Sequence, residues 1–199
     1  MLNETSQLLS DTVEKIFSDH VTKKCIINSE KGEWPKSLWT EVVDNGLNLV
    51  LVPEELGGVG GTWLEAGILF KAIGKYQAPI PLAENIVAGY LLSLGGISLP
   101  EKSIVTILGG ELTLKDNKIS GISRRTPFGS SATHAVAIIN DKSSPKVILT
   151  TIPQDSLSDD KNLALESRSN IEFLDHAVMN YSDISFTSEY IFKIGALMR

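Results

Sequence analysis

A glycine-rich run is the part of this sequence that most clearly invites a chemical role. It extends from Val52 to Thr62 as VPEELGGVGGT and leads into an apolar-periodic segment. Such a loop ahead of a helix can bind phosphate, because backbone N–H groups and the positive end of the helix dipole point at the anion. However, Gly58-x-Gly60 is followed by Trp63 rather than by a third glycine, and no Gly-Lys-Ser/Thr ending is present. We therefore interpret the run as a tight loop between helices, with phosphate binding as the alternative.

Other polar side chains that could do chemistry have weaker patterns. The Gly-Ser-Ser-Ala run that begins at Gly129 is not the Gly-x-Ser-x-Gly of a nucleophile elbow, so a serine nucleophile is not predicted. Arg124 and Arg125 are either a solvated hairpin face or a small anion site, and the sequence alone does not choose between them. Glu54 and Glu55 have no neighbours in sequence that would tune a pKa, which favours a solvated role.

The composition narrows the class of protein. Eighteen Lys and Arg residues against 24 Asp and Glu residues give a formal charge of −6, which argues against a main role in binding nucleic acid. One cysteine, Cys25, and three histidines are too few for an internal disulfide or a closed Cys/His zinc site. The apolar stretch 86–99 falls short of the roughly 20 residues of a membrane helix. We expect a cytoplasmic protein with no membrane span, nucleic-acid partner or metal.

Residues 1–100 read as a helical domain that would position these groups, because apolar residues recur at spacings of three and four. Trp34-Pro35 predicts a helix start, and Gly46 predicts the end of that helix. Thr62 and Glu65 predict a capping box, and Gly74 is expected to end the helix that follows it. The apolar stripes of the four expected helices lie at residues 8–21, 38–43, 64–73 and 82–94.

From about residue 104 the pattern changes to short β-branched runs bounded by turn residues. This pattern predicts a small antiparallel β-barrel or sandwich, and therefore an α+β fold. Asp116-Asn117 and Asn140-Asp141 lie between such runs, where Asn and Asp tolerate the positive φ of tight hairpins. The expected middle domain covers residues 101–186, with strands at 104–108, 112–114, 118–122, 135–139, 146–152 and 177–184.

Residues 187–199 return to a helical pattern with an apolar face that includes Ile191, Ile194 and Leu197. We expect this segment to be the start of a further, truncated C-terminal helix. Its apolar face needs cover, so the expectation is that the protein continues beyond Arg199 or borrows a partner. The alternative is that the helix folds back on the sheet.

Three blocks of residues, taken in order, resemble the acyl-CoA dehydrogenase family. The first resembles the N-terminal helical domain of that family, the second its middle-domain signature, and the third the opening of its C-terminal helical domain. The blocks are LWxxVxxxGL at 38–47 with VPEExGGxG at 52–60, then ISG at 119–121 with Gly129 and Ala132, then GALxR at 195–199.

The resemblance implies an enzyme that uses FAD to oxidise the α,β bond of an acyl-CoA thioester. A glutamate takes the α proton in such enzymes and the flavin takes the β hydride. The resemblance also implies a homo- or hetero-oligomer and, as a common electron acceptor, an electron-transfer flavoprotein. Because the glutamate of relatives belongs to the C-terminal helical domain, no catalytic residue is assigned in this chain.

The resemblance further places Arg125, Thr126 and Pro127 at the family's Trp-Ile-Thr segment, which lies against the flavin, so these three are the expected cofactor-binding residues. None of them matches the family pattern: Arg125 puts a cation where an aromatic ring is expected, and Pro127 has neither a hydroxyl nor an N–H. The segment between Pro100 and Lys118 is also too short for the family's second cofactor-contacting loop. These departures favour an alternative, a non-catalytic partner subunit of a heteromeric acyl-CoA dehydrogenase-like complex.

Overall fold

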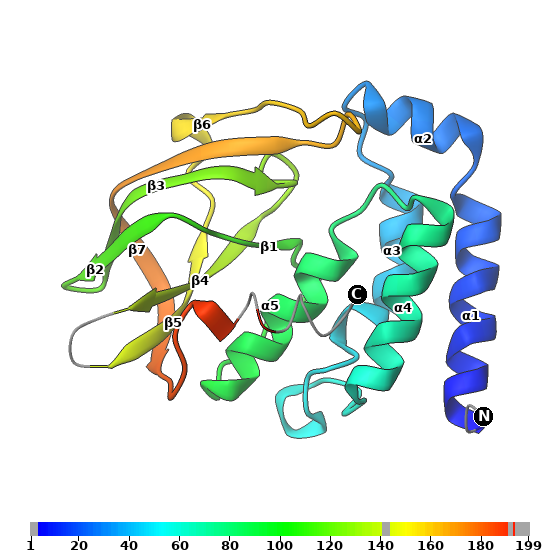
Figure 1. The fold of residues 1–199 in the computed structure, drawn as a ribbon, viewed down its shortest axis with the longest axis horizontal. Coiled ribbons are helices and arrows are strands. Elements are labelled where there is room, and N and C mark those ends of the chain that lie inside the picture. Colours follow the sequence, from blue (N-terminus) through cyan, green and yellow to red (C-terminus); the bar gives the residue numbers. More distant parts are fainter. Residues whose placement is uncertain (1–3, 141–143, 191–192, 194–199) are drawn as a thin grey trace.

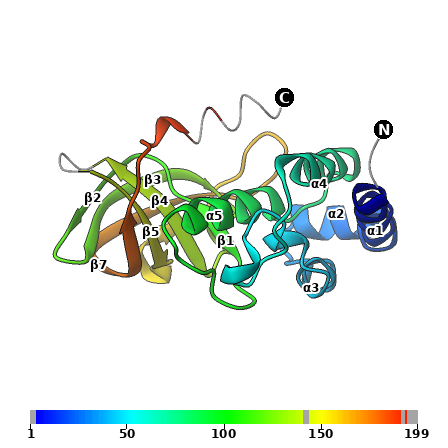
Figure 2. The same ribbon diagram turned by 90° about the horizontal axis from the view of Figure 1, so that it is seen from below.

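The computed structural model describes residues 4–140, 144–190 and 193. A layer of helices stands beside a curled β-sheet, and one helix, α5, lies between the sheet and the other helices (Figures 1 and 2). The α-helices are α1 (Glu4–His20), α2 (Lys23–Glu30), α3 (Lys36–Asp44), α4 (Trp63–Tyr76) and α5 (Leu82–Leu94). Two 3-10 turns, η1 (Leu47–Leu49) and η2 (Glu54–Leu56), lie between α3 and α4.

Helix α2 was not predicted from the sequence. It has eight residues and buries none of them, so it lacks the apolar stripe on which helix prediction depends. Its start is fixed instead by Thr22, whose hydroxyl accepts a hydrogen bond from the Cys25 N–H over 3.2 Å. A short helix that packs on its neighbours through few side chains leaves little periodic signal.

The expected helix ends are confirmed with one exception. Gly46 has a left-handed φ of 66° after α3, and Thr62 and Glu65 form the capping box of α4. The exception is Gly74, which does not end α4. The helix continues to Tyr76, and Gln77 takes the left-handed conformation at φ 53°. A glycine inside a helix costs up to about 1 kcal/mol but does not break hydrogen bonding.

The capping-box carboxylate also ties α4 to α1. Glu65 accepts hydrogen bonds from the hydroxyl and N–H of Thr62 and from the hydroxyl of the fully buried Ser6, the last over 2.7 Å. Hydrogen bonds from the Thr62 and Ser6 hydroxyls lower the pKa of the Glu65 carboxyl to about 2. The charged form is therefore the one that the fold stabilises.

This shift predicts a specific acid sensitivity. Because the folded pKa is depressed, the contribution of Glu65 is fully present above its unfolded value of 4.5 and is lost as pH falls toward about 2. Glu65→Gln keeps an accepting oxygen but removes the charge, so we expect it to lower the free energy of unfolding by up to about 1 kcal/mol at pH 7, the usual contribution of a negative charge at a helix N-terminus. Urea unfolding at pH 7 and pH 3 should show the difference shrinking at pH 3. The exposed Glu55→Gln is the control, and an equal effect in both variants would contradict the assignment.

The strands form one curled sheet in the order β1-β4-β5-β7-β3-β2, with β6 paired to β7. All pairs among the described strands are antiparallel except β1 with β4, which are parallel. That pair corrects the expectation of an all-antiparallel sheet. The β2–β3 hairpin lies between β1 and β4 in the chain. It returns the chain to the end of the sheet at which β1 begins, so β4 runs in the same direction as β1. The strands are β1 (Val105–Ile107), β2 (Glu111–Lys115), β3 (Lys118–Pro127), β4 (His134–Asn140), β5 (Pro145–Thr151), β6 (Leu157–Ser158) and β7 (Arg168–Asp183).

Strands β3 and β7 are longer than predicted because each contains a bulge. The register of their pairing shifts between Ser123 and Thr126, where Arg125 has φ 55°, and Asp175 in β7 has φ 48°. A bulge interrupts the alternation of buried and exposed side chains, so the sequence pattern covers only the part of each strand on one side of the bulge. The predicted turn at Asp116-Asn117 is confirmed, with φ of 50° and 60°.

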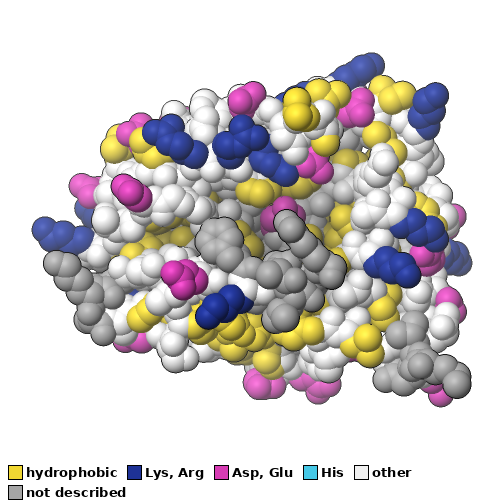
Figure 3. Space-filling view, viewed as in Figure 1, with side chains coloured by type: hydrophobic (Ala, Val, Ile, Leu, Met, Phe, Trp, Pro, Cys, Tyr) yellow, Lys and Arg dark blue, Asp and Glu magenta, His cyan; other side chains and the backbone are white. Residues whose placement is uncertain are grey.

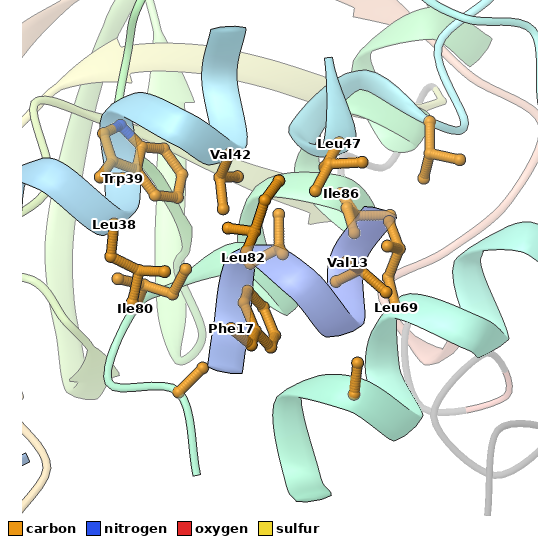
Figure 4. Packing of buried hydrophobic residues seen from close by; sticks show 14 of the residues in the cluster. Val13, Phe17, Leu38, Trp39, Val42, Leu47, Leu69, Ile80, Leu82 and Ile86 are labelled. Carbon is orange, nitrogen blue, oxygen red and sulfur yellow. The ribbon is translucent and has the colours of Figure 1, made fainter. Parts of the chain in front are cut away.

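Strand β4 is buried on both faces and joins two parts of the core. Its Val136 and Ile138 pack with α5, whereas Ala135, Ala137 and Ile139 face the inside of the curled sheet. A third cluster holds the helical layer together and includes Phe17 and Leu69 (Figure 4). Because these side chains bury apolar surface between α5 and the sheet, they stabilise α5 in its position against β4.

Most of the predicted C-terminal helix lies outside the described residues. Within them, Glu189, Tyr190 and Lys193 are helical. The Tyr190 hydroxyl lies 3.1 Å from that of Tyr90 on α5, so the start of this segment contacts the helical layer. None of the helices that the structure describes is long and apolar enough to cross a membrane.

Candidate functional site

A cavity of about 600 Å³ lies where the helical layer meets the loops of the sheet. Helix α2, the α2–α3 loop and the end of α4 form one side, and residues 128–131 and 159–167 form the other. Figure 3 shows one face of the molecule, on which hydrophobic side chains are visible between the sheet and the helices. The apolar part of the cavity wall consists mainly of Ile26, Trp34, Pro35, Ile73, Pro79 and Phe128.

One carboxylate organises the sheet side of this cavity. Asp159 accepts hydrogen bonds from the hydroxyls of Ser130, Ser167 and Ser169 over 2.7 to 3.1 Å. Within the Gly-Ser-Ser-Ala run, the Ser130 hydroxyl is thus used to hold the two loops together. The two histidines of the sheet bond elsewhere, His134 to Thr133 and His176 to Thr151, so they do not form a nucleophilic pair with these serines.

A lysine connects the two sides of the cavity. The Lys161 ammonium donates to the backbone carbonyl of Glu30 over 2.5 Å and so links the 159–167 loop to the end of α2. On the same loop, Glu166 accepts from the Arg168 guanidinium over 2.9 Å and from the Asn162 amide over 2.7 Å. These contacts fix the loop against the helical layer and define the cavity rim.

The three expected cofactor-binding residues lie together at the end of β3 but present different groups. Arg125 is exposed at the bulge, and its N–H donates to the Asn170 side chain over 3.1 Å. Thr126 is buried, and its hydroxyl lies 2.8 Å from that of Ser123. Pro127 offers its carbonyl to the Thr106 hydroxyl over 2.6 Å. Of the three side chains, that of Arg125 is the exposed one that could reach a ligand from this edge.

Thr106 and Glu84 were not predicted from the sequence. Thr106 is fully buried on β1 and holds the Pro127 carbonyl, which fixes the end of β3. Glu84 lies in the first turn of α5, where burial raises the pKa of its carboxyl and the charge of Arg168 opposes that rise. No sequence signal could have indicated the interaction between Glu84 and Arg168, because the two residues are 84 positions apart in the chain and only the fold brings their charges near each other.

The glycine-rich run forms a tight loop. The N–H of Gly60 donates to Val52, and the N–H of Gly61 donates to Val50, over 2.9 and 2.8 Å. A Cβ at Gly58 would lie 2.0 Å from the Val52 carbonyl oxygen, so the backbone here is packed closely. Because these N–H groups are used within the loop, they are not free to bind phosphate, and the structural interpretation is confirmed.

Comparison of the sequence with known proteins shows the family of this chain. Residues 3–111, more than half of the chain, match the family model described as "Acyl-CoA dehydrogenase, N-terminal domain". The chain belongs to the acyl-CoA dehydrogenase family. It is 31% identical over 99 residues to the acyl-CoA dehydrogenase IpdE2 of Mycolicibacterium smegmatis, which covers 47% of this chain and 32% of that protein. It is 29% identical over 109 residues to IpdE2 of Mycobacterium tuberculosis, covering 53% of this chain and 33% of that protein.

Solved structures share the fold over all or nearly all of the chain. The ChsE4-ChsE5 complex from Mycobacterium tuberculosis matches 100% of this chain and 62% of its own, with a TM-score of 0.80 and 19% identity. A variant of the steroid ACAD Tcur3481-Tcur3483 matches 98% and 61%, with a TM-score of 0.81 and 19% identity. The chain therefore spans about a third of its curated relatives and about three fifths of these structures. The resemblance read from the sequence is confirmed at the level of family and fold.

Proposed function

We propose that the chain is part of an FAD-dependent acyl-CoA dehydrogenase that oxidises the α,β bond of an acyl-CoA thioester. The observation that carries this proposal is the family match over residues 3–111, joined to a fold that solved structures, a steroid ACAD among them, share over nearly the whole chain. FAD, where bound, supplies the hydride acceptor. This chain contributes the helical layer, the sheet and the edge at the end of β3. A homo- or hetero-oligomer would complete the site, with an electron-transfer flavoprotein as acceptor.

At that edge the residues fit a flavin contact through charge rather than through a hydroxyl. The Thr126 hydroxyl is engaged with Ser123, and Pro127 has no N–H, so Arg125 is left as the donor that could face FAD. A guanidinium presents several N–H donors and a flat surface that stacks on aromatic rings. We propose that Arg125 contacts the cofactor directly and that Thr126 and Pro127 position it through the bonds to Ser123 and Thr106.

The second candidate is a non-catalytic subunit that keeps the fold while a partner chain holds the flavin. Its support is the same set of departures, since an exposed arginine replaces the aromatic residue of the family pattern. The structures that share this fold include a complex of two different proteins, ChsE4-ChsE5. In this case the contribution of the chain is a surface rather than a redox centre.

Cofactor binding by the whole protein separates the two candidates. We expect purified protein to carry a flavin absorbance band that bleaches when the acyl-CoA substrate is added. Arg125→Ala should weaken FAD binding about tenfold or more, because a hydrogen bond to a charged group contributes roughly 1.5 to 3 kcal/mol. Arg124→Ala, the neighbouring exposed arginine, is the matched control and should leave binding unchanged.

Each of the two candidate functions has a result that would contradict it. A colourless protein that does not bind added FAD would reject catalysis by this chain and leave the partner-subunit candidate. That candidate in turn requires that omission of the chain from co-expression with a dehydrogenase-like partner lowers activity. Unchanged activity without the chain would reject it.

A further inference from the structure

Arg125 has an unusual backbone conformation at the bulge of β3. Its φ is 55°, in the left-handed region that residues other than glycine adopt rarely and at an energetic cost. Strand β3 lies beside β7 (Figure 1), and the register of their pairing shifts between Ser123 and Thr126. Because a strained conformation persists only where its surroundings enforce it, the contacts of Arg125 show what holds the bulge.

A side chain of the neighbouring strand holds this conformation. The N–H of Arg125 donates to the Asn170 side-chain oxygen over 3.1 Å. Asn170 lies on β7 and is half-buried, and its backbone pairs on the other side with Ser158 of β6. The residue is therefore fixed within the sheet, and it offers an acceptor to a backbone N–H at the point where the register of the β3–β7 ladder shifts.

The bulge also decides the direction in which the Arg125 side chain leaves the strand. An extra residue in one strand places two consecutive side chains on the same face, and Arg124 and Arg125 are both exposed. Buried hydroxyls fix the backbone on the opposite face: the Ser123 hydroxyl lies 2.8 Å from that of Thr126 and accepts from the Gly109 N–H over 3.1 Å. The backbone at Arg125 is thus held from both faces of the strand.

We propose that Asn170 is a positioning residue that holds Arg125 in its strained conformation and so directs the guanidinium to the cofactor. This inference rests on the proposed contact between Arg125 and FAD and deepens it. A guanidinium that is already held in place loses less freedom when it binds, so part of the cofactor affinity comes from Asn170. Asn170 acts through Arg125 rather than by touching the cofactor.

A second bulge in the same pair of strands provides a matched control. Asp175 on β7 has φ 48°, and its N–H donates to the Ser120 hydroxyl over 3.1 Å. Here too a left-handed residue other than glycine is held by a side chain of the paired strand. This bulge lies toward the opposite end of the β3–β7 pairing from Arg125. Ser120→Ala therefore releases a bulge of the same kind without altering the end of β3 that carries Arg125.

Hydrogen exchange on the whole protein tests whether Asn170 holds Arg125. Asn170→Ala should speed exchange of the Arg125 amide at least about tenfold, because loss of the acceptor leaves this N–H open to water. Ser120→Ala should speed exchange of the Asp175 amide instead and leave that of Arg125 unchanged. Unchanged exchange at Arg125 in Asn170→Ala would overturn the inference. Because the measurement needs no flavin, this failure is distinguishable from failure of the proposed function.

Cofactor affinity tests whether the positioning contributes to binding. Asn170→Ala should weaken FAD binding about fivefold or more, because the conformation of Arg125 that binds is then only part of the population. It should also shift the absorbance of bound flavin in the same direction as Arg125→Ala does, whereas Ser120→Ala should change neither property. In the Arg125→Ala background, Asn170→Ala should weaken binding by no more than about twofold further.

These measurements also define how the inference fails. Equal FAD affinity in Asn170→Ala and Ser120→Ala would overturn it, and so would additive losses in the double variant of Asn170 and Arg125, because a residue that acts through another has no effect once the other is removed. Either result leaves FAD binding by the unmodified protein in place, so the proposed function would stand.

Discussion

Gly121→Ala is expected to destabilise the protein by about 3 kcal/mol or more, among the largest effects of a single methyl group in this chain. Gly121 lies in β3 at φ 128°, a conformation that L side chains rarely adopt. An added Cβ would lie 2.2 Å from the Glu111 carbonyl oxygen of the paired strand β2. The backbone of the β2–β3 hairpin would have to move, because the obstacle is a carbonyl group rather than the end of a flexible side chain.

Gly109→Ala is the matched control for that experiment. Gly109 precedes the same hairpin, and a Cβ there would meet nothing within 4 Å. Urea unfolding should therefore give a change within about 0.5 kcal/mol for Gly109→Ala, as for most unconstrained surface positions. Similar losses in the two variants would mean that the close approach of β2 to Gly121 is not what limits this position.

Phe17→Ala is expected to lower the free energy of unfolding by about 3 to 5 kcal/mol. Phe17 is fully buried on α1 and meets the ring of Tyr76 edge to face, with centroids 5.9 Å apart. It packs in the cluster that joins α1, α3, α4 and α5 (Figure 4), so truncation leaves a cavity that these helices cannot close without losing other contacts. The measurement is the midpoint and slope of denaturant unfolding.

Leu8→Ala tests the same kind of truncation on the exposed side of α1. The Leu8 side chain is 67% exposed, so its loss removes little buried surface. We expect a change of about 0.5 kcal/mol or less. A loss comparable with that of Phe17→Ala would indicate that another surface covers Leu8 in solution.

Local signals in the sequence were sufficient for the helical layer and for much of the sheet. The capping box at Thr62, the left-handed Gly46 and the hairpin at Asp116-Asn117 each depend on residues within four positions of one another, and each is present. The family was accessible for the same reason, because its motifs are short runs whose order survives in the chain. Helix α2 escaped prediction because it has no buried stripe to leave a pattern.

The tertiary structure decided the features that join distant segments. The parallel pairing of β1 with β4 depends on where the β2–β3 hairpin returns the chain, and the bulge at Arg125 depends on pairing with β7. The cavity exists because loop 159–167 meets α2, through a contact between Lys161 and Glu30 that spans 131 residues. The sequence alone determined the local conformations, since neighbouring atoms fix them. Only the fold determined which faces, charges and carbonyl groups meet, since those depend on the packing of segments that the sequence separates.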